Sequence, residues 1–373
     1  MPDRFKMIPD YEVKIRVSML AEREDYNIQM MNIPEMWKST KGKGVKLAIL
    51  DTGLPKHVDL SPAGGISFVD DYLEDRNGHS THCGGIVAAV LGNGVGVAGI
   101  APEVDDWYGA VLDGGGSGDI ETIVRGIRWA TDTLGADVIS MSLGIAAGAP
   151  LFKALEAACN YAVGQGTAVF AAAGNESGDV GQPAIYDSVI AVAAVNSRQE
   201  HAAFSNSGKE VDFAAGGVDV YSTYLNNSYA VLSGTSMACP ALAAVGALIL
   251  AKHKDAGQRL TPAELYAHLQ RIAYNVNGDG FDAVYGYGIP IFQPNGDEPV
   301  NTPIQPVRTP KKRHTLIASV SEDCEVWQLW NVFITNTMLH KAAGKSMDDA
   351  MAEGFRCAYA KTKEINDNLL RSK

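Results

Sequence analysis

The chain has 373 residues, of which 46% are hydrophobic and 20% charged, a globular composition with room for one large domain or two ordinary ones. Its formal net charge of −12 argues against a binder of nucleic acids or anionic membranes, because such binders depend on Lys and Arg. The N-terminus has no apolar core like that of a signal peptide, and the five cysteines are scattered without a CxxC pair. The sequence therefore predicts a cytoplasmic protein with free thiols.

In chain order, residues 1–30 are expected to form an N-terminal extension and residues 31–294 the main domain. Within that domain, apolar runs of strand length alternate with segments of helix length. This alternation predicts an α/β fold with a doubly wound, mostly parallel sheet and helices on both faces. The expected strands are 45–50, 138–142, 168–173 and 189–195, and the expected helices are 120–134, 149–164 and 236–253. The longest apolar run, 237–251, is shorter than the ~20 residues that span a bilayer and reads as a buried helix.

The composition changes after the main domain. Residues 295–314 carry four prolines and are expected to be a linker, whose basic cluster 311–314 is interpreted as solvated. Residues 315–373 are expected to form a helical extension, with a helix capped by Ser346. The apolar stripe on that helix suggests docking against the main domain or against another subunit, which leaves a homodimer open.

Three polar segments have the residue types of nucleophilic catalysis. Asp51 directly follows a predicted strand, residues 77–85 hold two histidines, and Ser236 opens the long apolar helix. A serine hydroxyl needs a neighbouring imidazole to take its proton, and the imidazole needs a carboxylate to orient it. Asn175, after another strand, could donate its side-chain amide to an oxyanion. Taken singly, each has a plain reading as a turn former, a structural histidine or a helix cap; together they predict a catalytic site.

With these segments in view, the chain resembles the subtilisin-like serine proteases over about residues 30–290, and most closely the intracellular subtilisins of bacilli. The resemblance implies a serine endopeptidase that acts on proteins or peptides through an acyl-enzyme. It implies a triad of Asp51, His82 and Ser236, with His82 chosen over His79 because it leads into Cys83-Gly84-Gly85. Met7-Ile8-Pro9 is similar to a motif of that family's N-terminal extensions, which lie across the active site and are later removed, so a zymogen is expected.

The resemblance also implies binding sites for substrate and metal. The pocket for the side chain before the scissile bond would be walled by Ser142-Leu143-Gly144 and Ala172-Ala173-Gly174, with Gly181 as its floor. The segment Gly116-Ser117-Gly118 would pair with the substrate backbone. A structural calcium would take the side chains of Asp59 and Asn93 and the carbonyls of Leu91, Val95 and Val97. The alternative for residues 91–97 is a Gly-rich surface loop.

The chain departs from the family pattern at two positions, where Ser80 replaces a glycine and Ala241 replaces a histidine. Cys83 is similar to the cysteine of the family's thiol-containing branch, which implies sensitivity to mercurials, whereas the plainer interpretation, a small buried hydrophobe, is favoured. The competing function is a catalytically silent scaffold that binds a partner through its C-terminal helices.

Overall fold

The computed structural model describes residues 5–7, 12–16, 22–69, 72–278 and 280–293. The chain divides into two compact units, Met1–Thr309 and Pro310–Lys373. The expected linker 295–314, including its basic cluster, and the expected helical extension 315–373 lie outside the described residues, so they remain predictions.

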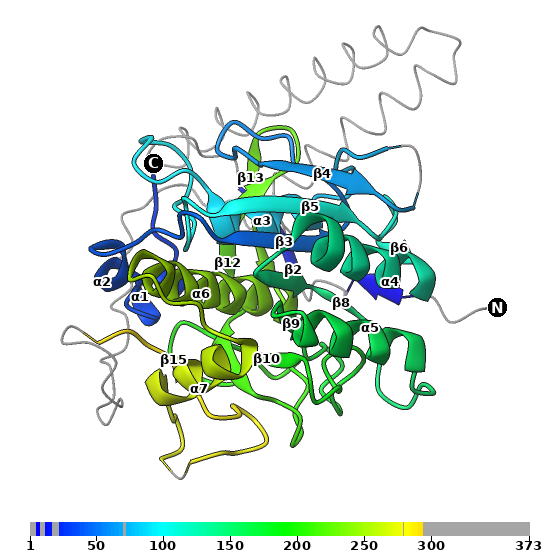
Figure 1. The fold of residues 1–373 in the computed structure, drawn as a ribbon. Coiled ribbons are helices and arrows are strands. Elements are labelled where there is room, and N and C mark those ends of the chain that lie inside the picture. Colours follow the sequence, from blue (N-terminus) through cyan, green and yellow to red (C-terminus); the bar gives the residue numbers. More distant parts are fainter. Residues whose placement is uncertain (1–4, 8–11, 17–21, 70–71, 279, 294–373) are drawn as a thin grey trace, which may run out of the picture. The chain divides into compact units, whose positions relative to one another are not determined.

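A seven-stranded parallel sheet forms the centre of the first unit, in the order β11-β10-β9-β7-β3-β5-β4 (Figure 1). The strands are β3 Lys46–Asp51, β4 Gly64–Ser67, β5 Asp105–Ala110, β7 Val138–Met141, β9 Ala168–Ala172, β10 Ile190–Val195 and β11 Phe213–Gly216. All four strands expected from the sequence are present within one or two residues. Their continuous apolar runs fit because both faces of this sheet are covered.

Helices cover both faces of this sheet, as predicted. Ser140 of β7 and Phe170 of β9 are paired in register and so point to the same face. Both meet α6 (Thr235–Asp255), since Ser140 Oγ lies 3.6 Å from Cys239 Sγ and a Cβ on Gly246 would touch the Phe170 ring at 3.0 Å. Leu50 of β3 points to the other face of the sheet, because its neighbour Ile49 pairs with Ser140. A Cβ built on Gly126 of α4 (Ile120–Arg128) would lie 3.5 Å from Leu50, so α4 covers that face. The expected α/β fold class is confirmed.

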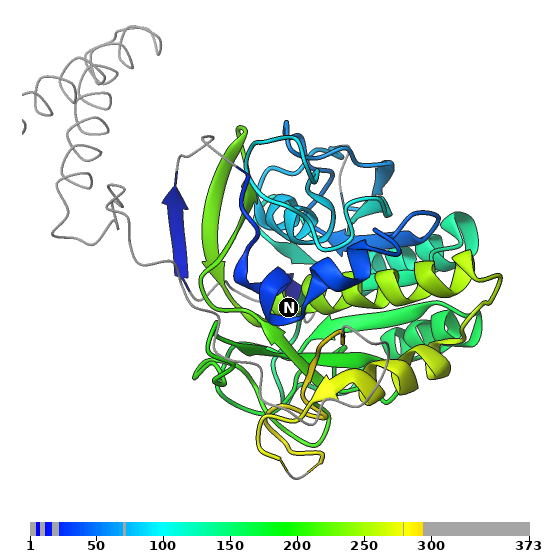
Figure 2. The ribbon, with the colours of Figure 1, turned by 90° about the vertical axis from the view of Figure 1, so that its left-hand side faces the viewer.

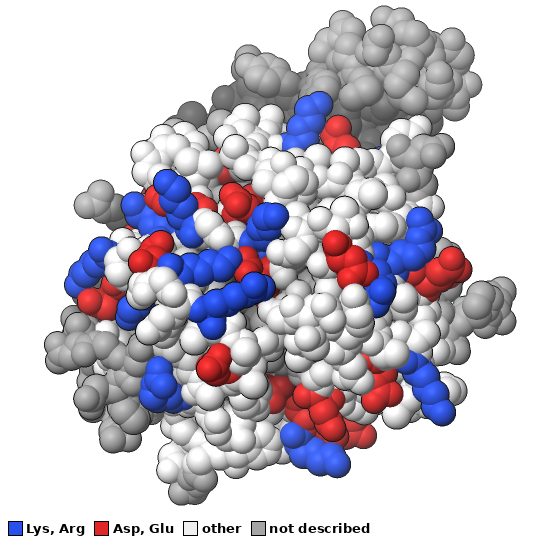
Figure 3. Space-filling model, viewed as in Figure 1, with Lys and Arg blue, Asp and Glu red and all other residues white. Residues whose placement is uncertain are grey.

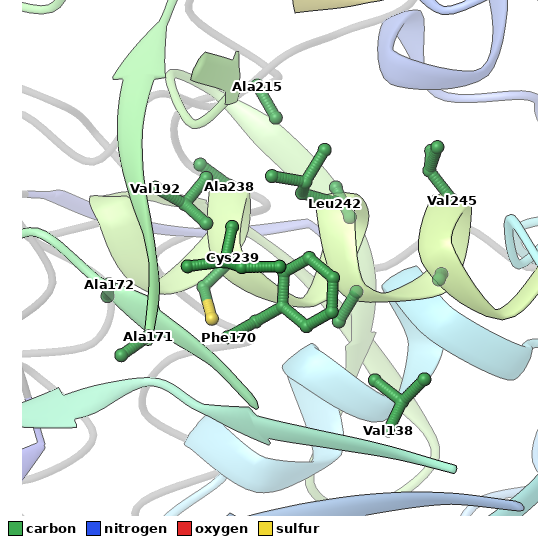
Figure 4. Close-up of a cluster of buried hydrophobic side chains, with 14 of the residues drawn as sticks. Val138, Phe170, Ala171, Ala172, Val192, Ala215, Ala238, Cys239, Leu242 and Val245 are labelled. Atoms are coloured by element: carbon green, nitrogen blue, oxygen red, sulfur yellow. The ribbon is translucent and has the colours of Figure 1, made fainter. Parts of the chain in front are cut away.

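The long helix α6 is the core of the molecule. It packs across β7, β9, β10 and β11 and against α3 (His79–Ala88). Figure 4 shows Cys239 and Leu242 of α6 among side chains of these strands, including Phe170 and Val192. By length and composition α6 could cross a membrane, but its most apolar 18-residue window is 94% buried inside the protein. The prediction of a buried helix is confirmed.

The remaining helices are α1 Tyr26–Met30, α2 Ile33–Trp37, α5 Lys153–Gly164 and α7 Pro262–Ile272. The helix expected at 120–134 is α4 followed by a π-helical segment, η1 (Trp129–Leu134). The helix expected from residue 149 begins only at Lys153. The segment before Lys153 is not helical because its backbone binds the side chain of Gln182 instead. That side chain accepts from Phe152 N at 2.9 Å and donates to Pro150 O at 3.1 Å.

Three small antiparallel sheets surround this core. The first has β1 (Phe5–Met7) between β6 (Ser117–Gly118) and β8 (Leu143–Gly144), and β1 is the dark blue arrow in Figure 1. The second has the order β12-β13-β2, with bounds β2 Glu12–Arg16, β12 Val220–Tyr224 and β13 Ser228–Ser233. Figure 2 shows a dark blue strand of the N-terminal segment beside the green hairpin. The third pairs β14 (Ala273–Tyr274) with β15 (Ile289–Pro290).

Charges on the face drawn in Figure 3 are mixed. Among the described residues on this face, Lys and Arg side chains stand beside Asp and Glu side chains, and no patch of one sign covers it. Such interspersed charges contribute little to stability individually.

Candidate active site

The carboxylate of Asp51 binds the ring of His79. Asp51 is the last residue of β3, two residues after Ile49, so both side chains lie on the same face of the sheet. Ile49 pairs with Ser140, and this is the face that α3 and α6 cover. His79 Nδ1 lies 2.8 Å from Asp51 Oδ1 and 2.9 Å from Oδ2, and both side chains are completely buried. Since a carboxylate oxygen can only accept, Nδ1 carries the proton and Nε2 is the basic nitrogen of His79.

His82, which the sequence analysis placed in the triad, does not contact Asp51, and that choice is wrong. Its Nε2 lies 3.2 Å from both Val220 O and Ala230 O, on the hairpin β12–β13. Its Nδ1 has no hydrogen-bond partner in the described part of the chain. Burial lowers the pKa of His82 to about 3, so the ring stays neutral and donates from Nε2. His82 ties α3 to the hairpin.

Asp75 holds the start of α3 in place, and the sequence analysis missed it. Its Oδ1 accepts from Thr52 Oγ1 and from the amides of Asn77 and Gly78, at 2.9–3.0 Å. Its Oδ2 accepts from the amide and the hydroxyl of Thr81, at 2.9 and 2.6 Å. A carboxylate on the first turn of a helix satisfies its open N–H groups and favours its dipole. The signal in the sequence was Asp75 followed by Asn77-Gly78.

Ser80 also helps to hold the first turn of α3 in place. It replaces the family's glycine, and its buried hydroxyl donates to Gly53 O at 2.5 Å while its amide donates to Thr52 Oγ1 at 3.1 Å. Farther along α3, Gly84 cannot carry a side chain, because a Cβ there would lie 2.3 Å from the Tyr108 hydroxyl. Ala241, at the second departure from the family, is fully buried in α6.

Ser236, the second residue of α6, lies beside this histidine–aspartate pair. Its carbonyl accepts from Ser142 Oγ at 2.8 Å and from the thiol of Cys83 at 3.5 Å. The Cys83 sulfur in turn lies within 4.8 Å of the ligand atoms of Asp51 and His79. Cys83 thus joins the end of β3, the first turn of α3 and the first turn of α6. It is a free thiol, as are the other described cysteines, Cys159 and Cys239.

The side-chain amide of Asn175 points toward the start of α6. Its Oδ1 accepts from Thr235 N at 2.9 Å and from Thr235 Oγ1 at 2.8 Å, which fixes the orientation of the amide. A Cβ built on Gly234 would lie 3.0 Å from Asn175 Nδ2 and 3.6 Å from Ser236 N. Asn175 Nδ2 and the backbone N–H of Ser236 thus both lie beside Gly234, next to the candidate nucleophile, and a side-chain amide with a backbone N–H is the donor pair that an oxyanion hole uses.

The segments expected to wall the substrate pocket come together. Ile145, next to the first segment, exchanges two backbone hydrogen bonds of 3.0 Å with Gln182, and Gly181 N donates to Ala173 O of the second at 3.2 Å. A Cβ on Gly181 would lie 2.4 Å from Ile145 O, so only glycine fits between the two segments. This is where a pocket floor is expected.

The N-terminal segment lies between the two edge strands that were expected to hold substrate. Phe5 pairs with Gly118 and Lys6 with Ser117 on β6, while Lys6 pairs with Gly144 and Met7 with Leu143 on β8. Gly118 must remain glycine, because a Cβ there would lie 2.1 Å from Val111 O. The loop before β6 is held by Asp113 Oδ1, which accepts from Gly115 N and Ser117 N at 2.9 and 3.0 Å.

The loop 91–97 surrounds the fully buried carboxylate of Asp59. That carboxylate accepts from Asn93 Nδ2 at 2.5 Å, Val97 N at 3.0 Å and the Tyr229 hydroxyl at 3.2 Å. Desolvation raises the pKa of Asp59, and the hydrogen bonds from Val97, Asn93 and Tyr229 offset that rise only in part. A Cβ on Gly96 would lie 2.2 Å from Asp59 Oδ2, so the loop closes on the carboxylate. Asp59 and Asn93 bring side-chain oxygens to the same loop, and oxygen is the ligand atom that Ca²⁺ takes.

Glu22, which the sequence analysis did not single out, lies on the same loop. Its carboxylate accepts from Gly92 N at 2.8 and 2.9 Å and from Gly94 N at 3.1 Å. It brings a second acid to this part of the molecule, and it directly follows the N-terminal segment in sequence. No sequence signal pointed to it, because its role depends on two loops that meet in space.

The comparison with known proteins agrees with this geometry. Residues 42–288 match the Subtilase family. The chain belongs to this family. It is 46% identical to subtilisin DY of Bacillus licheniformis over 72% of this chain and 97% of the relative. It is 40% identical to thermitase of Thermoactinomyces vulgaris, over 68% of this chain and 90% of the relative, and 42% identical to the major intracellular serine protease of Bacillus subtilis, over 68% and 86%.

Membership in the subtilase family makes this chain a serine endopeptidase of the subtilisin type, as the sequence analysis expected, and proteins or peptides are its substrates. The residues matched by the family contain Asp51, His79, Asn175 and Ser236.

Proposed function

We propose that this subtilase hydrolyses peptide bonds with Ser236 as nucleophile, His79 as general base and Asp51 as the carboxylate that orients His79. The observation that carries this assignment is the double contact of His79 Nδ1 with the Asp51 carboxylate, in a buried site beside the first turn of α6. Proton transfer to Nε2 makes His79 an imidazolium, which the adjacent carboxylate stabilises.

In the acylation step, Ser236 Oγ attacks the scissile carbonyl and its proton passes to His79 Nε2. The negative charge that develops on the carbonyl oxygen is held by Asn175 Nδ2, on an amide that Thr235 already orients, and by Ser236 N. His79 then gives its proton to the leaving amine, and water repeats the sequence on the acyl-enzyme. Asp75 and Thr52 act as positioning residues, because they hold the turn that carries His79.

The enzyme is proposed to be made as a zymogen. The supporting observation is that β1 lies as the central strand between β6 and β8, where an extended substrate would add a strand. While β1 occupies those edges, a substrate cannot pair with them. An intracellular location is proposed from the free, buried thiols of the three described cysteines, and the name of one relative agrees with it.

The alternative of a catalytically silent scaffold is decided by a fluorophosphonate probe. Its phosphorus is attacked by an activated serine oxygen, and fluoride leaves. We expect stoichiometric labelling of the protein after limited proteolysis of the N-terminal segment, and none in Ser236→Ala. Mass spectrometry of the labelled peptide locates the adduct. Absence of labelling in the trimmed wild-type protein would support the scaffold and refute the enzyme assignment.

A structural calcium is proposed at the loop 91–97, with Asp59 and Asn93 as side-chain ligands and the carbonyls of Leu91, Val95 and Val97, in line with the calcium that subtilases commonly bind. We expect excess EDTA to lower the melting temperature of Ser236→Ala, a background that cannot digest itself. A ligand at about 100 times its Kd stabilises the native state by about 2.7 kcal/mol.

The matched control is Asp59→Asn in the same background, which keeps the side-chain size but removes the charge. Its melting temperature should respond to calcium much less than that of the parent, whatever its starting value. Equal melting temperatures of the parent in calcium and in EDTA would eliminate the proposed site.

A further inference from the structure

Asn206 is a buried polar residue that the mechanism above does not use. It lies on the connection between β10 and β11, and only 1% of it is exposed. Its side-chain amide contacts one loop, residues 173–179, through both its oxygen and its nitrogen. Oδ1 accepts from the amides of Glu176 and Gly178 at 2.9 and 3.0 Å, and Nδ2 donates to Ala173 O, Glu176 Oε2 and Asp179 O at 3.2, 2.8 and 2.9 Å.

The loop that Asn206 holds carries Asn175, and both neighbours of Asn175 contact Asn206. The backbone N–H of Asn206 donates to Gly174 O at 2.9 Å, and Asn206 Oδ1 accepts from Glu176 N. Gly174 has φ +116°, a conformation that glycine adopts easily, and a Cβ there would overlap Asn206 Nδ2. The loop therefore wraps closely around the Asn206 amide, which fixes the backbone on either side of Asn175.

The start of α6 fixes Asn175 from the other direction. Thr235 donates to Asn175 Oδ1 through its amide and its hydroxyl, and Thr235 Oγ1 accepts from Gly174 N at 3.2 Å. Asn175 is thus held between Thr235 and Asn206. An oxyanion donor must lie about 2.7–3.1 Å from the developing charge and must be in place beforehand, so a small shift of this loop would weaken the contact.

We propose that Asn206 is a positioning residue for catalysis, whose amide fixes the loop that aims Asn175 Nδ2 at the oxyanion. The inference rests on the proposed function, in which Asn175 is the oxyanion donor. The Asn206 amide is enclosed by the loop, so its effect on the reaction passes through Asn175. That effect belongs to kcat more than to KM, because the oxyanion exists in the transition state and not in the bound substrate.

The first test measures kcat and KM of Asn206→Ala and Asn206→Asp on a chromogenic peptide. Each variant is made as the full chain and assayed after the same trimming of its N-terminal segment. Alanine removes every side-chain hydrogen bond, and aspartate loses the Nδ2 donations and places a second carboxylate beside Glu176. We expect kcat to fall about ten- to hundredfold, because misplacing a catalytic group by about 1 Å costs up to about 10²-fold, and KM to change much less.

Thr167→Val is the matched control for loss of a buried hydrogen bond. Thr167 is buried at the opposite end of β9 from this loop, and its hydroxyl donates to Ala136 O at 2.7 Å. Valine keeps the shape and removes that bond. The control should lower the melting temperature and leave kcat unchanged, which is also the result expected of Asn206→Ala if Asn206 were only a structural residue.

A double-mutant cycle with Asn175→Ala shows whether Asn206 acts through Asn175. In a subtilisin, loss of this donor lowers kcat by about 10²–10³-fold, a value measured on a relative rather than obtained from this structure. Once the donor is gone, its position no longer matters, so Asn206→Ala should lower kcat little further in the Asn175→Ala background. Additive losses in the cycle would show that Asn206 acts on another step.

A peptide boronic acid gives a second measurement on the same variants. Its boron bonds to Ser236 Oγ and becomes tetrahedral, with an oxygen in the place of the oxyanion. We expect its inhibition constant to rise by about the same factor as kcat falls, while the affinity for the uncharged amide of the product peptide stays the same. If Asn206→Ala does not fold, Asn206→Ser, which retains a hydroxyl, replaces it in both tests.

The results separate this inference from the proposed function. Unchanged kcat in the folded Asn206 variants, or additive losses in the cycle, would overturn the inference and leave the proposed function intact, because Asn175→Ala still lowers kcat. Unchanged kcat in Asn175→Ala itself would refute the oxyanion role given to Asn175 in the proposed function, and this inference with it.

Discussion

We expect His79→Ala to abolish peptide hydrolysis and His82→Leu to leave most of it. His79 bears the only described imidazole that meets Asp51, so its loss removes the general base. In a subtilisin, loss of the triad histidine lowers kcat by about 10⁶-fold, a value measured on a relative rather than obtained from this structure. Steady-state kinetics on a chromogenic peptide, after trimming of the N-terminal segment, measure both variants.

His82→Leu should change stability instead. Leucine keeps an apolar volume at that position but removes the donor to Val220 O and Ala230 O, which costs about 1–3 kcal/mol for buried acceptors left unpaired. Urea unfolding in the Ser236→Ala background measures this loss, while kcat/KM of the single variant should fall by less than tenfold. The opposite pattern, with His82→Leu inactive and His79→Ala active, would overturn the assignment of the base.

We expect Lys6→Pro to activate the full-length chain and Lys6→Ala to leave it inhibited. Lys6 is the residue of β1 that pairs with both neighbouring strands, with Ser117 on β6 and Gly144 on β8. A proline there removes the backbone N–H, whereas alanine retains it. A tethered strand competes with substrate at an effective concentration of about millimolar, so its release should raise kcat/KM ten- to hundredfold.

Adding a synthetic peptide of residues 1–11 to the Lys6→Pro protein should restore inhibition, competitively with substrate. Initial rates must be taken before any self-trimming, which gel electrophoresis at each time point monitors. Unchanged rates in Lys6→Pro would show that β1 does not block the substrate edges, and the zymogen proposal would then fail.

Much of the fold and half of the catalytic geometry follow from local patterns. β3, β7, β9 and β10 are continuous apolar runs, and such runs are typical of a parallel sheet covered on both faces. Asp51 ends one of those strands and Ser236 begins the apolar helix α6, so both lie where ligands of such sheets bind.

The choice between the two histidines could not be made from the sequence. His79 and His82 lie three residues apart on α3, about 60° apart around the helix axis. Which of them faces Asp51 depends on the rotation of α3 against β3 and β13, and that rotation is decided by contacts such as those of Asp75 at the first turn and Gly84 against Tyr108. The family pattern contains both histidines, so a choice by the flanking residues picked the wrong one.

Two residues of the proposed triad, Asp51 and Ser236, could be predicted from local sequence patterns, whereas the histidine depends on tertiary packing. Local patterns predict the parallel sheet, the aspartate at the end of β3, the serine at the start of α6 and the amide of Asn175, because each depends on the pattern of its own segment. Which histidine contacts Asp51, and where β1 and β2 pair, follow from packing and could not be predicted in this way. Helix rotation is set by side chains distant in sequence, and backbone pairing carries almost no signal in the side chains of the strand that is added.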